Sequence, residues 1–334
     1  MFRNIVSLYR FCFIFSSFIL SASICYAGNK LIPPEDSMYC SVSNPLGITY
    51  DTKYSRKTLF IDSADNIISG ESGKLAVVRP SKIDVYIYGK LVKTFQRNSA
   101  SDISLIGWMN GNLIIQNNGK FQLLPIKKNS TKFMDPKLPP NTVTVVDLQE
   151  SQMIFVQGDN GILVLKKNNN IIMGRLNIPG YLARNPIIVS KRDFVTIETM
   201  ELKNNTVDSR NGVTIWAIDS KDFKAKKIRH YSKSISIAPV YDRISILVSE
   251  YNNSSAKLKS TNIVEIDLIA NKNQIIVKDI QGQFDVLGFT SDNKYLVGIR
   301  VKAEVGPGTL ETISLSDKAH TLLRDNVYDC FMVH

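Results

Sequence analysis

One stretch decides the fold of this chain: Phe289-Thr290-Ser291-Asp292-Asn293-Lys294-Tyr295-Leu296-Val297. An apolar strand ends in a tight polar turn, and a second apolar strand follows. Aspartate and asparagine supply the side-chain hydrogen bonds and the positive φ angles that tight turns need. The stretch therefore predicts two antiparallel strands joined by a short connection.

The same unit recurs six times from Leu59 onward. In each copy a polar turn precedes a strong apolar strand, and these strands begin 38, 40, 41, 50 and 51 residues apart. Weaker strands precede each turn and follow each strong strand, which gives four strands per unit. The strong strands begin near Leu75, Leu113, Met153, Phe194, Ile244 and Tyr295.

Four-stranded antiparallel units of about 40 to 50 residues are typical of β-propeller blades. We therefore predict an all-β chain that forms a six- or seven-bladed β-propeller of four-stranded antiparallel blades, closed by pairing of N- and C-terminal strands. A seventh blade would combine Val327–Val333 with partners from Cys40–Tyr50. A pair of β-sandwiches and a β-solenoid are the alternatives, although sandwiches rarely show six such cycles and solenoid repeats are shorter.

Residues 289–297 resemble the Phe-Ser-Pro-Asp-Gly-Lys-x-Leu-Ala blade signature of TolB-like propellers and of the N-terminal propeller of prolyl oligopeptidase-type peptidases. Thr290, Ser291 and Asn293 replace the Ser, Pro and Gly of that signature. The resemblance covers residues 58–326 as an architecture and is specific in one blade. It implies the propeller fold, and it carries over neither a substrate nor a partner because one fold hosts many functions.

The first 27 residues have the order of a secretory signal peptide. Two arginines without an acid precede an apolar run from Phe11 to Ala22, and small residues precede a cleavage point after Ala27. An uncleaved membrane anchor is the alternative, but the run is shorter than the roughly 20 residues that span a bilayer. We expect a periplasmic or secreted protein in which an N-terminal segment, 28–57, contributes to closure of a propeller at 58–334.

Cysteine usage fits an exported chain. Two of the four cysteines lie in the expected signal, and Cys40 and Cys330 remain near the two ends of the mature chain. Paired thiols form disulfides in oxidising compartments. We predict a Cys40–Cys330 disulfide that fastens the closure; two unrelated buried thiols are the alternative.

Catalytic residues are not predicted for this chain. The sequence contains no Gly-x-Ser-x-Gly nucleophile turn, no Ser–His–acid set in a recognisable order and no phosphate-binding loop. The histidines His230, His320 and His334 are far apart along the sequence and are interpreted as ordinary residues. No cofactor and no metal are predicted.

Acids at strand ends keep an enzymatic alternative open. Several of them would face the axis of the ring, as ligands do in Ca²⁺-dependent lactonase propellers, although such acids are also common turn formers. They are Asp62, Asp147, Asp219, Asp267 and Asp285. The alternative function is therefore a metal-dependent small-molecule hydrolase or lactonase-type enzyme.

The formal net charge of +11 is unevenly spread. One predicted face holds the connections from first to second and from third to fourth strands, and it would meet an anionic envelope polymer, a membrane surface or an acidic protein. A solvated lysine-rich surface is the alternative, and no nucleic-acid partner is expected for an exported chain. The basic residues of this face are Lys127, Lys128, Lys166, Lys167, Lys191, Arg192, Lys221, Lys224, Lys226 and Lys227.

The opposite face carries three long connections, Glu198–Asn211, Glu250–Ser260 and Lys302–Gly308. Long loops on a rigid scaffold often hold binding specificity, and tolerated polar insertions are the alternative. We predict an exported, non-enzymatic propeller that binds a protein or an envelope component. A propeller detached from a serine peptidase and acting as its partner is a third hypothesis, and the oligomeric state is left open.

Overall fold

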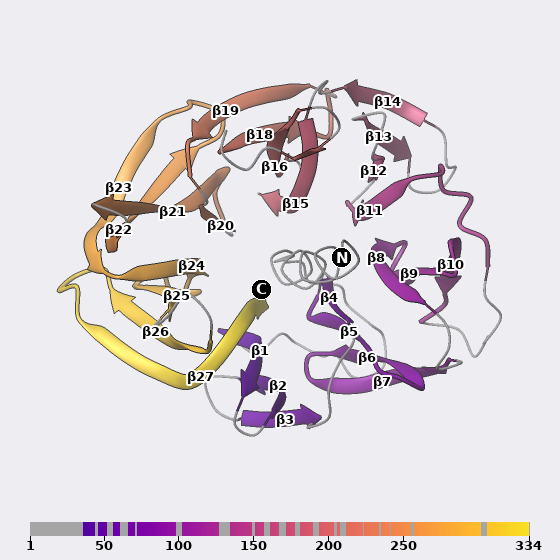
Figure 1. Ribbon diagram of the computed structural model, residues 1–334, viewed down its shortest axis with the longest axis horizontal. Helices are drawn as coiled ribbons and strands as arrows, with labels where there is room; N and C mark the ends of the chain where they lie inside the picture. Colours follow the sequence, from indigo (N-terminus) through magenta and orange to yellow (C-terminus); the bar gives the residue numbers. More distant parts are fainter. Residues whose placement is uncertain are drawn as a thin grey trace, which may run out of the picture.

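The computed structural model shows an all-β chain whose sheets are arranged in a ring (Figure 1). The signal peptide expected at 1–27 lies outside the residues that the structure describes. In the part that is described, no helix is long and apolar enough to cross a membrane. The structure describes residues 36–43, 46–51, 56–60, 66–70, 72–97, 102–126, 134–148, 151–156, 161–166, 172–177, 181–189, 194–203, 206–207, 212–222, 224–233, 235–240, 242–254, 257–301 and 306–333.

Three sheets follow the predicted four-strand pattern, with consecutive strands paired antiparallel. The first contains β4 (Asn66–Gly70), β5 (Lys74–Val78), β6 (Lys82–Ile87) and β7 (Lys90–Gln96). The second contains β15 (Tyr181–Val189), β16 (Phe194–Lys203), β18 (Val213–Asp219) and β19 (Ala225–Tyr231), with β17 (Thr206–Val207) added to β16. The third contains β20 (Ser236–Pro239), β21 (Ser245–Ser254), β22 (Lys257–Asp267) and β23 (Asn273–Gln281).

A fourth sheet has seven strands because two antiparallel units meet in it. The units touch through a single parallel pair of residues, Gly107 of β8 and Val145 of β11. The strands are, in spatial order, β10 (Lys120–Leu124), β9 (Asn112–Asn117), β8 (Ile103–Met109), β11 (Thr142–Asp147), β12 (Ser151–Val156), β13 (Gly161–Lys166) and β14 (Ile172–Asn177).

The fifth sheet also has seven strands, and it joins the two ends of the chain. Its long strand β27 pairs with β26 along its first half and with β1 along its second half. The pairing of N- and C-terminal strands is therefore confirmed. The strands are, in spatial order, β24 (Gln283–Phe289), β25 (Tyr295–Val301), β26 (Gly308–Ser314), β27 (His320–Val333), β1 (Ser37–Ser43), β2 (Leu46–Asp51) and β3 (Arg56–Phe60).

The number of sheets differs from the prediction. The described strands form five sheets, so the expected six or seven separate blades are wrong as a count, and no sheet closes on itself through hydrogen bonds. The physical reason is strand sharing. Gly107 and Val145 approach closely enough to join two units, and β27 is long enough to serve two sets of neighbours.

The turn inside residues 289–297 has the predicted chemistry. The Oδ1 atom of Asp292 accepts hydrogen bonds from Thr290 Oγ1 at 2.7 Å and from the backbone N–H of Lys294 at 3.1 Å. Asn293 has a φ of 56°, in the left-handed region that asparagine tolerates. These interactions reverse the chain between β24 and β25, as the sequence pattern indicates.

Buried hydrogen bonds join neighbouring sheets of the ring. The hydroxyl of Tyr39 in β1 donates to the Gly73 carbonyl at 2.6 Å and accepts from the Gly89 N–H at 2.9 Å. Trp108 in β8 donates through its indole N–H to the Ser69 carbonyl at 3.0 Å. These three bonds satisfy the polar atoms of two large buried rings, which would otherwise be costly to bury.

Gly107→Ala is expected to lower the free energy of unfolding by about 2–3 kcal/mol, the usual range for overpacking combined with backbone strain. A Cβ atom at Gly107 would lie 2.2 Å from the Val145 carbonyl oxygen, and its φ is 152°. Urea unfolding followed by intrinsic fluorescence measures the change. Gly119→Ala is the matched control, since Gly119 also has a positive φ, 79°, but a Cβ there has nothing within 4 Å. Equal losses for the two variants would contradict the role given to the Gly107–Val145 contact.

Candidate functional site

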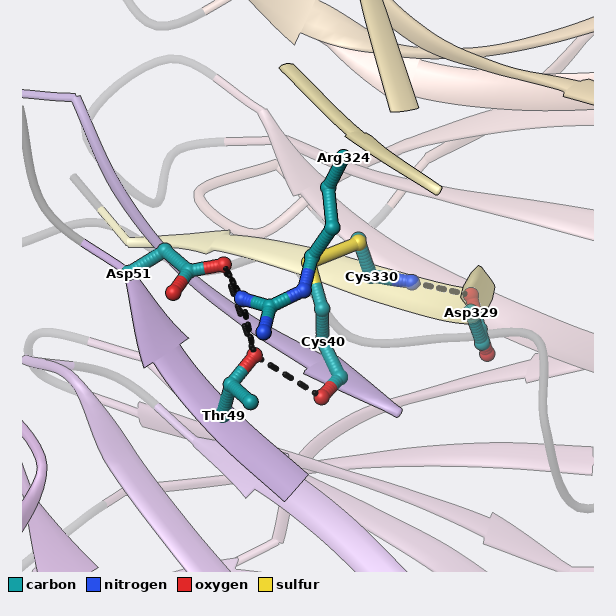
Figure 2. The surroundings of a disulfide bond; sticks show 6 residues. All are labelled: Cys40, Thr49, Asp51, Arg324, Asp329 and Cys330. Carbon is teal, nitrogen blue, oxygen red and sulfur yellow. Dashed lines mark hydrogen bonds and ion pairs between the residues drawn. A yellow bond between two sulfur atoms is a disulfide. The ribbon is translucent and has the colours of Figure 1, made fainter. Parts of the chain in front are cut away.

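The joint between the two ends of the chain is covalent. Cys40 in β1 and Cys330 in β27 form a disulfide, with Cα atoms 4.2 Å apart and 290 residues between the cysteines in sequence (Figure 2). Both cysteines are buried. The predicted disulfide is thereby confirmed, because the antiparallel register of β1 and β27 places the two residues directly opposite each other.

A buried ion pair lies on one side of this disulfide (Figure 2). Arg324 of β27 donates through Nη1 to the carboxylate of Asp51 and, at 3.0 Å, to Thr49 Oγ1. Thr49 in turn donates to the Cys40 carbonyl at 3.4 Å. The three residues link β27 to β2 across β1, and they therefore reinforce the same joint as the disulfide.

Asp329 lies on the other side of the disulfide (Figure 2). Its Oδ1 atom accepts the backbone N–H of Cys330 at 2.8 Å. Its Oδ2 atom is shielded from solvent and has no hydrogen-bond partner within the described ranges. Burial raises the pKa of the Asp329 carboxyl well above its usual range. The hydrogen bond from the Cys330 N–H lowers this pKa, and the nearby charge of Asp285 raises it further.

Asp285 in β24 is the second carboxyl near the centre of the ring. Tyr251, from β21, donates its hydroxyl to Asp285 Oδ1. Gln283 donates through Nε2 to Oδ1 and Oδ2 at 3.1 and 3.3 Å. Burial nevertheless raises the pKa of the Asp285 carboxyl, because it exceeds the effect of these two donors.

We call Tyr251, Gln283, Asp285 and Asp329 the inner cluster. In Figure 1, β24 and the end of β27 lie close to the centre of the ring. Burial and the charge of Asp285 also raise the pKa of the Tyr251 hydroxyl, so this group stays protonated and remains a donor. The cluster can hold protons and offer both donors and acceptors to a polar group.

The other acids predicted for the axis have structural roles or lie outside the described residues. Asp219 and Asp267 accept backbone N–H groups in the turns that follow β18 and β22. Asp147, at the end of β11, accepts the Gly111 N–H at 3.2 Å. Asp62 lies outside the described ranges. Of the five acids predicted for the axis, the described residues therefore place Asp285 alone in the inner cluster.

The histidines are not brought together where the structure describes them. His230 Nδ1 lies 3.0 Å from Thr214 Oγ1. His320 Nδ1 lies 3.0 Å from Arg300 Nη2 and 3.3 Å from Glu311 Oε2. His334 lies outside the described residues, and no group of three or more His, Cys, Asp or Glu side chains in the described ranges is placed to hold a metal ion.

Four residues of the predicted basic face are described with their side chains. Lys221, Lys224, Lys226 and Lys227 are exposed around the connection from β18 to β19. Lys224 pairs with Asp222 at 3.1 Å, and the Lys226 ammonium donates to the carbonyls of Leu268 and Ile269 at 3.3 and 2.9 Å. Outside the described residues or side chains lie Lys127, Lys128, Lys166, Lys167, Lys191 and Arg192.

Two of the three long connections are β-hairpins rather than loops. Strands β21 and β22 continue to the pair Ser254–Lys257, past the point where β20 begins opposite Ser249. Strand β16 continues to Lys203 and pairs with β17. The third connection, Lys302–Gly308, lies partly outside the described residues.

Sequence reasoning found Asp285 and missed Tyr251, Gln283 and Asp329. Tyr251 follows the strong apolar run 244–248, and Asp329 directly precedes Cys330. A carboxyl beside a cysteine that is expected to close the ring is the one signal that would have pointed to Asp329. Its neighbour Asp285 is 44 residues away in sequence, and only the closure brings the two strands together.

No family model and no curated protein matches the sequence. Solved structures do resemble the chain. The dihydro-heme d1 dehydrogenase NirN is similar with a TM-score of 0.54 and 12% identity, over 93% of this chain and 77% of that one. A Bacteroides fragilis protein described as a 6-phosphogluconolactonase is similar with a TM-score of 0.50 and 13% identity, over 92% of this chain and all of that one.

The fold is that of a β-propeller. TolB from Acinetobacter baumannii is also among the similar structures, with a TM-score of 0.48 and 11% identity over 90% of this chain and 66% of that one. NirN and the Bacteroides fragilis protein are each less than 15% identical to this chain, so their likeness shows a shared architecture alone.

Proposed function

We propose that this propeller is an exported binding scaffold whose partner is a protein or an envelope component. The partner would be held by the face that carries the β21–β22 hairpin, which we call the hairpin face. The observation that carries the proposal is the extension of β21 and β22 beyond their neighbours in the sheet. A hairpin held by its own backbone hydrogen bonds presents side chains at a fixed position at little entropic cost. Binding residues are commonly found on such extensions of a rigid scaffold.

Export is part of the same proposal. The disulfide joins two cysteines that are 290 residues apart, and a bond of this kind persists in oxidising compartments outside the cytosol. The signal-like order of residues 1–27 gives independent support from the sequence. We infer a periplasmic or secreted location after cleavage near Ala27.

The basic face is a secondary contact in this proposal, made with an anionic polymer, a membrane surface or an acidic protein. Lys227 and its exposed neighbours Lys221, Lys224 and Lys226 would supply it. Part of their charge is already engaged, since Lys224 pairs with Asp222 and Lys226 binds two carbonyl groups. The hairpin face therefore has priority as the binding surface.

A shortened hairpin tests the proposal directly. Residues 253–259 would be replaced by Asn-Gly, because Asn252 pairs with Ser260 and a two-residue type I′ turn closes such a pair. We expect partner recovery after light cross-linking in the native host to fall at least tenfold, while the melting temperature stays within a few degrees. Mass spectrometry against a tag-only chain quantifies the partner.

Asn118→Asp is the matched control, because it alters the two-residue turn between β9 and β10 in a different sheet. Its partner recovery should equal that of the wild type. If the shortened hairpin recovers the same partners in the same amounts as Asn118→Asp, the hairpin face is not the binding surface.

The inner cluster favours a second candidate function, the binding or conversion of a small polar molecule. Buried carboxyls with raised pKa values, together with a tyrosine donor, are a common feature of such sites. This candidate predicts that ligand binding survives removal of the hairpin tip and is lost in Asp285→Asn. Ligand screening by thermal shift with these two variants separates it from the scaffold proposal.

A further inference from the structure

The closing joint of the ring brings two carboxyl groups onto adjoining inner strands. Strand β24 packs against β27, and each contributes one acid, Asp285 and Asp329. Asp329 also adjoins the disulfide through the N–H of Cys330. The pair therefore lies where the last strand of the chain meets both its sheet neighbours and its covalent link.

Neither carboxyl is neutralised by a cation in the described part of the chain. Arg300 of the neighbouring β25 lies 5.9 Å from the centre of the Phe284 ring, and its Nε atom donates to Glu311 at 2.9 Å. Arg229 lies 3.5 Å from Glu250. These guanidinium groups are engaged with other acids.

Among the described side chains, the other titratable groups that act on the pair are acids or tyrosines. Tyr251 faces Asp285 and donates to it, and buried Glu198 of β16 adds negative charge near Tyr251. The stretch of β1 that lies opposite Asp329, from Tyr39 to Val42, contains no charged residue. An added negative charge at Asp329 therefore has no compensating group among the residues that the structure describes.

We propose that the Asp285–Asp329 pair makes the packing of β24 against β27 sensitive to pH. The two strands pack tightly while the pair holds a proton, and they separate more easily when both carboxyls ionise. Two like charges in a shielded site repel each other strongly, and water is needed to stabilise them. The disulfide keeps the chain ends together, so the response is a local opening of the inner strands and not global unfolding.

The sign of the effect follows from linkage. A carboxyl whose pKa is higher in the folded state than in the unfolded state stabilises the fold fully below the unfolded pKa of about 4. That stability is lost as the pH rises through the folded pKa. The pKa values of both carboxyls are raised in the fold. The packing of β24 against β27 is therefore tightest in mild acid and loosens toward neutral and alkaline pH.

Hydrogen–deuterium exchange measures this opening in the intact, oxidised protein. After correction for the intrinsic pH dependence of exchange, we expect peptides covering 283–289 and 327–333 to exchange at least tenfold faster at pH 8 than at pH 5.5. Peptides covering 151–156, which share no hydrophobic cluster with β24 or β27, should show no corrected difference. Asp329→Asn keeps an acceptor for the Cys330 N–H and cannot ionise, so it should abolish the difference.

Asp279→Asn is the matched control, an exposed acid at a positive φ of 55° that asparagine also tolerates. It should keep the wild-type pH dependence. Asp285→Asn is the second test variant, in case Asp329→Asn does not fold. Equal corrected exchange at the two pH values in the wild type, or an unchanged pH dependence in both test variants, would overturn the proposal.

Discussion

Replacing Cys40 and Cys330 together by alanine is expected to lower the free energy of unfolding by about 4–5 kcal/mol. The disulfide closes a loop of 290 residues, and cross-linking so long a loop removes much of the conformational freedom of the unfolded chain. Both cysteines are buried, so the alanines also leave unfilled volume. Urea unfolding of the double variant beside the oxidised wild type measures the loss.

The reduced wild type separates the contribution of the covalent bond from that of the volume left unfilled by the alanines. It keeps both sulfur atoms and lacks only the bond, so it should lose most of the same stability, and its intact mass should rise by two hydrogens. The slope of the urea transition should also increase when the bond is absent, because the unfolded chain exposes more surface. A double variant as stable as the oxidised wild type would show that β1 and β27 hold the ring closed through other contacts alone.

Arg324→Ala is expected to cost about 3–5 kcal/mol, the usual effect of removing one partner from a buried ion pair. The side chains of Arg324 and Asp51 are only 14% and 12% exposed. Without the guanidinium, the Asp51 carboxylate would remain buried next to the closing strands without its cation. Thr49 would lose the same donor, which weakens its link to the Cys40 carbonyl.

Lys224→Ala supplies the control, since Lys224 pairs with Asp222 at 3.1 Å and the two side chains are 79% and 45% exposed. An exposed pair contributes at most about 1 kcal/mol. In Arg324→Ala/Asp51→Asn, the orphaned charge is removed and part of the lost stability should return. If Arg324→Ala and Lys224→Ala lose the same amount of stability, the ion pair between Arg324 and Asp51 is not a stabilising contact.

The strands of the propeller could be predicted because their pattern is local. Observed β5, β9, β12, β16, β21 and β25 begin within one residue of Leu75, Leu113, Met153, Phe194, Ile244 and Tyr295, except β12, which begins two residues earlier. In each case a polar turn and an apolar run are adjacent in the sequence, so the signal needs no distant partner. The disulfide was predictable for a similar reason, since only two cysteines remain after the expected signal.

The sheet count and the inner cluster depend on contacts between distant residues. No local pattern shows that Gly107 meets Val145 through a backbone pair, or that β27 changes partners at Val327. Asp329 acquires its surroundings only when β27 reaches β1 and β24. The hairpin at Glu250–Ser260 could not be predicted as strands, because its polar residues lack the apolar alternation of a half-buried strand.

The shared strand β27 has a consequence for the order of events during synthesis. Strand β1 is among the first parts of the ring to leave the ribosome, yet its partner residues 327–333 are among the last. While the chain is being made, β1 has one edge open. The ring therefore closes only after residues 327–333 have been made, and any chaperone that protects nascent strands must cover β1 until then.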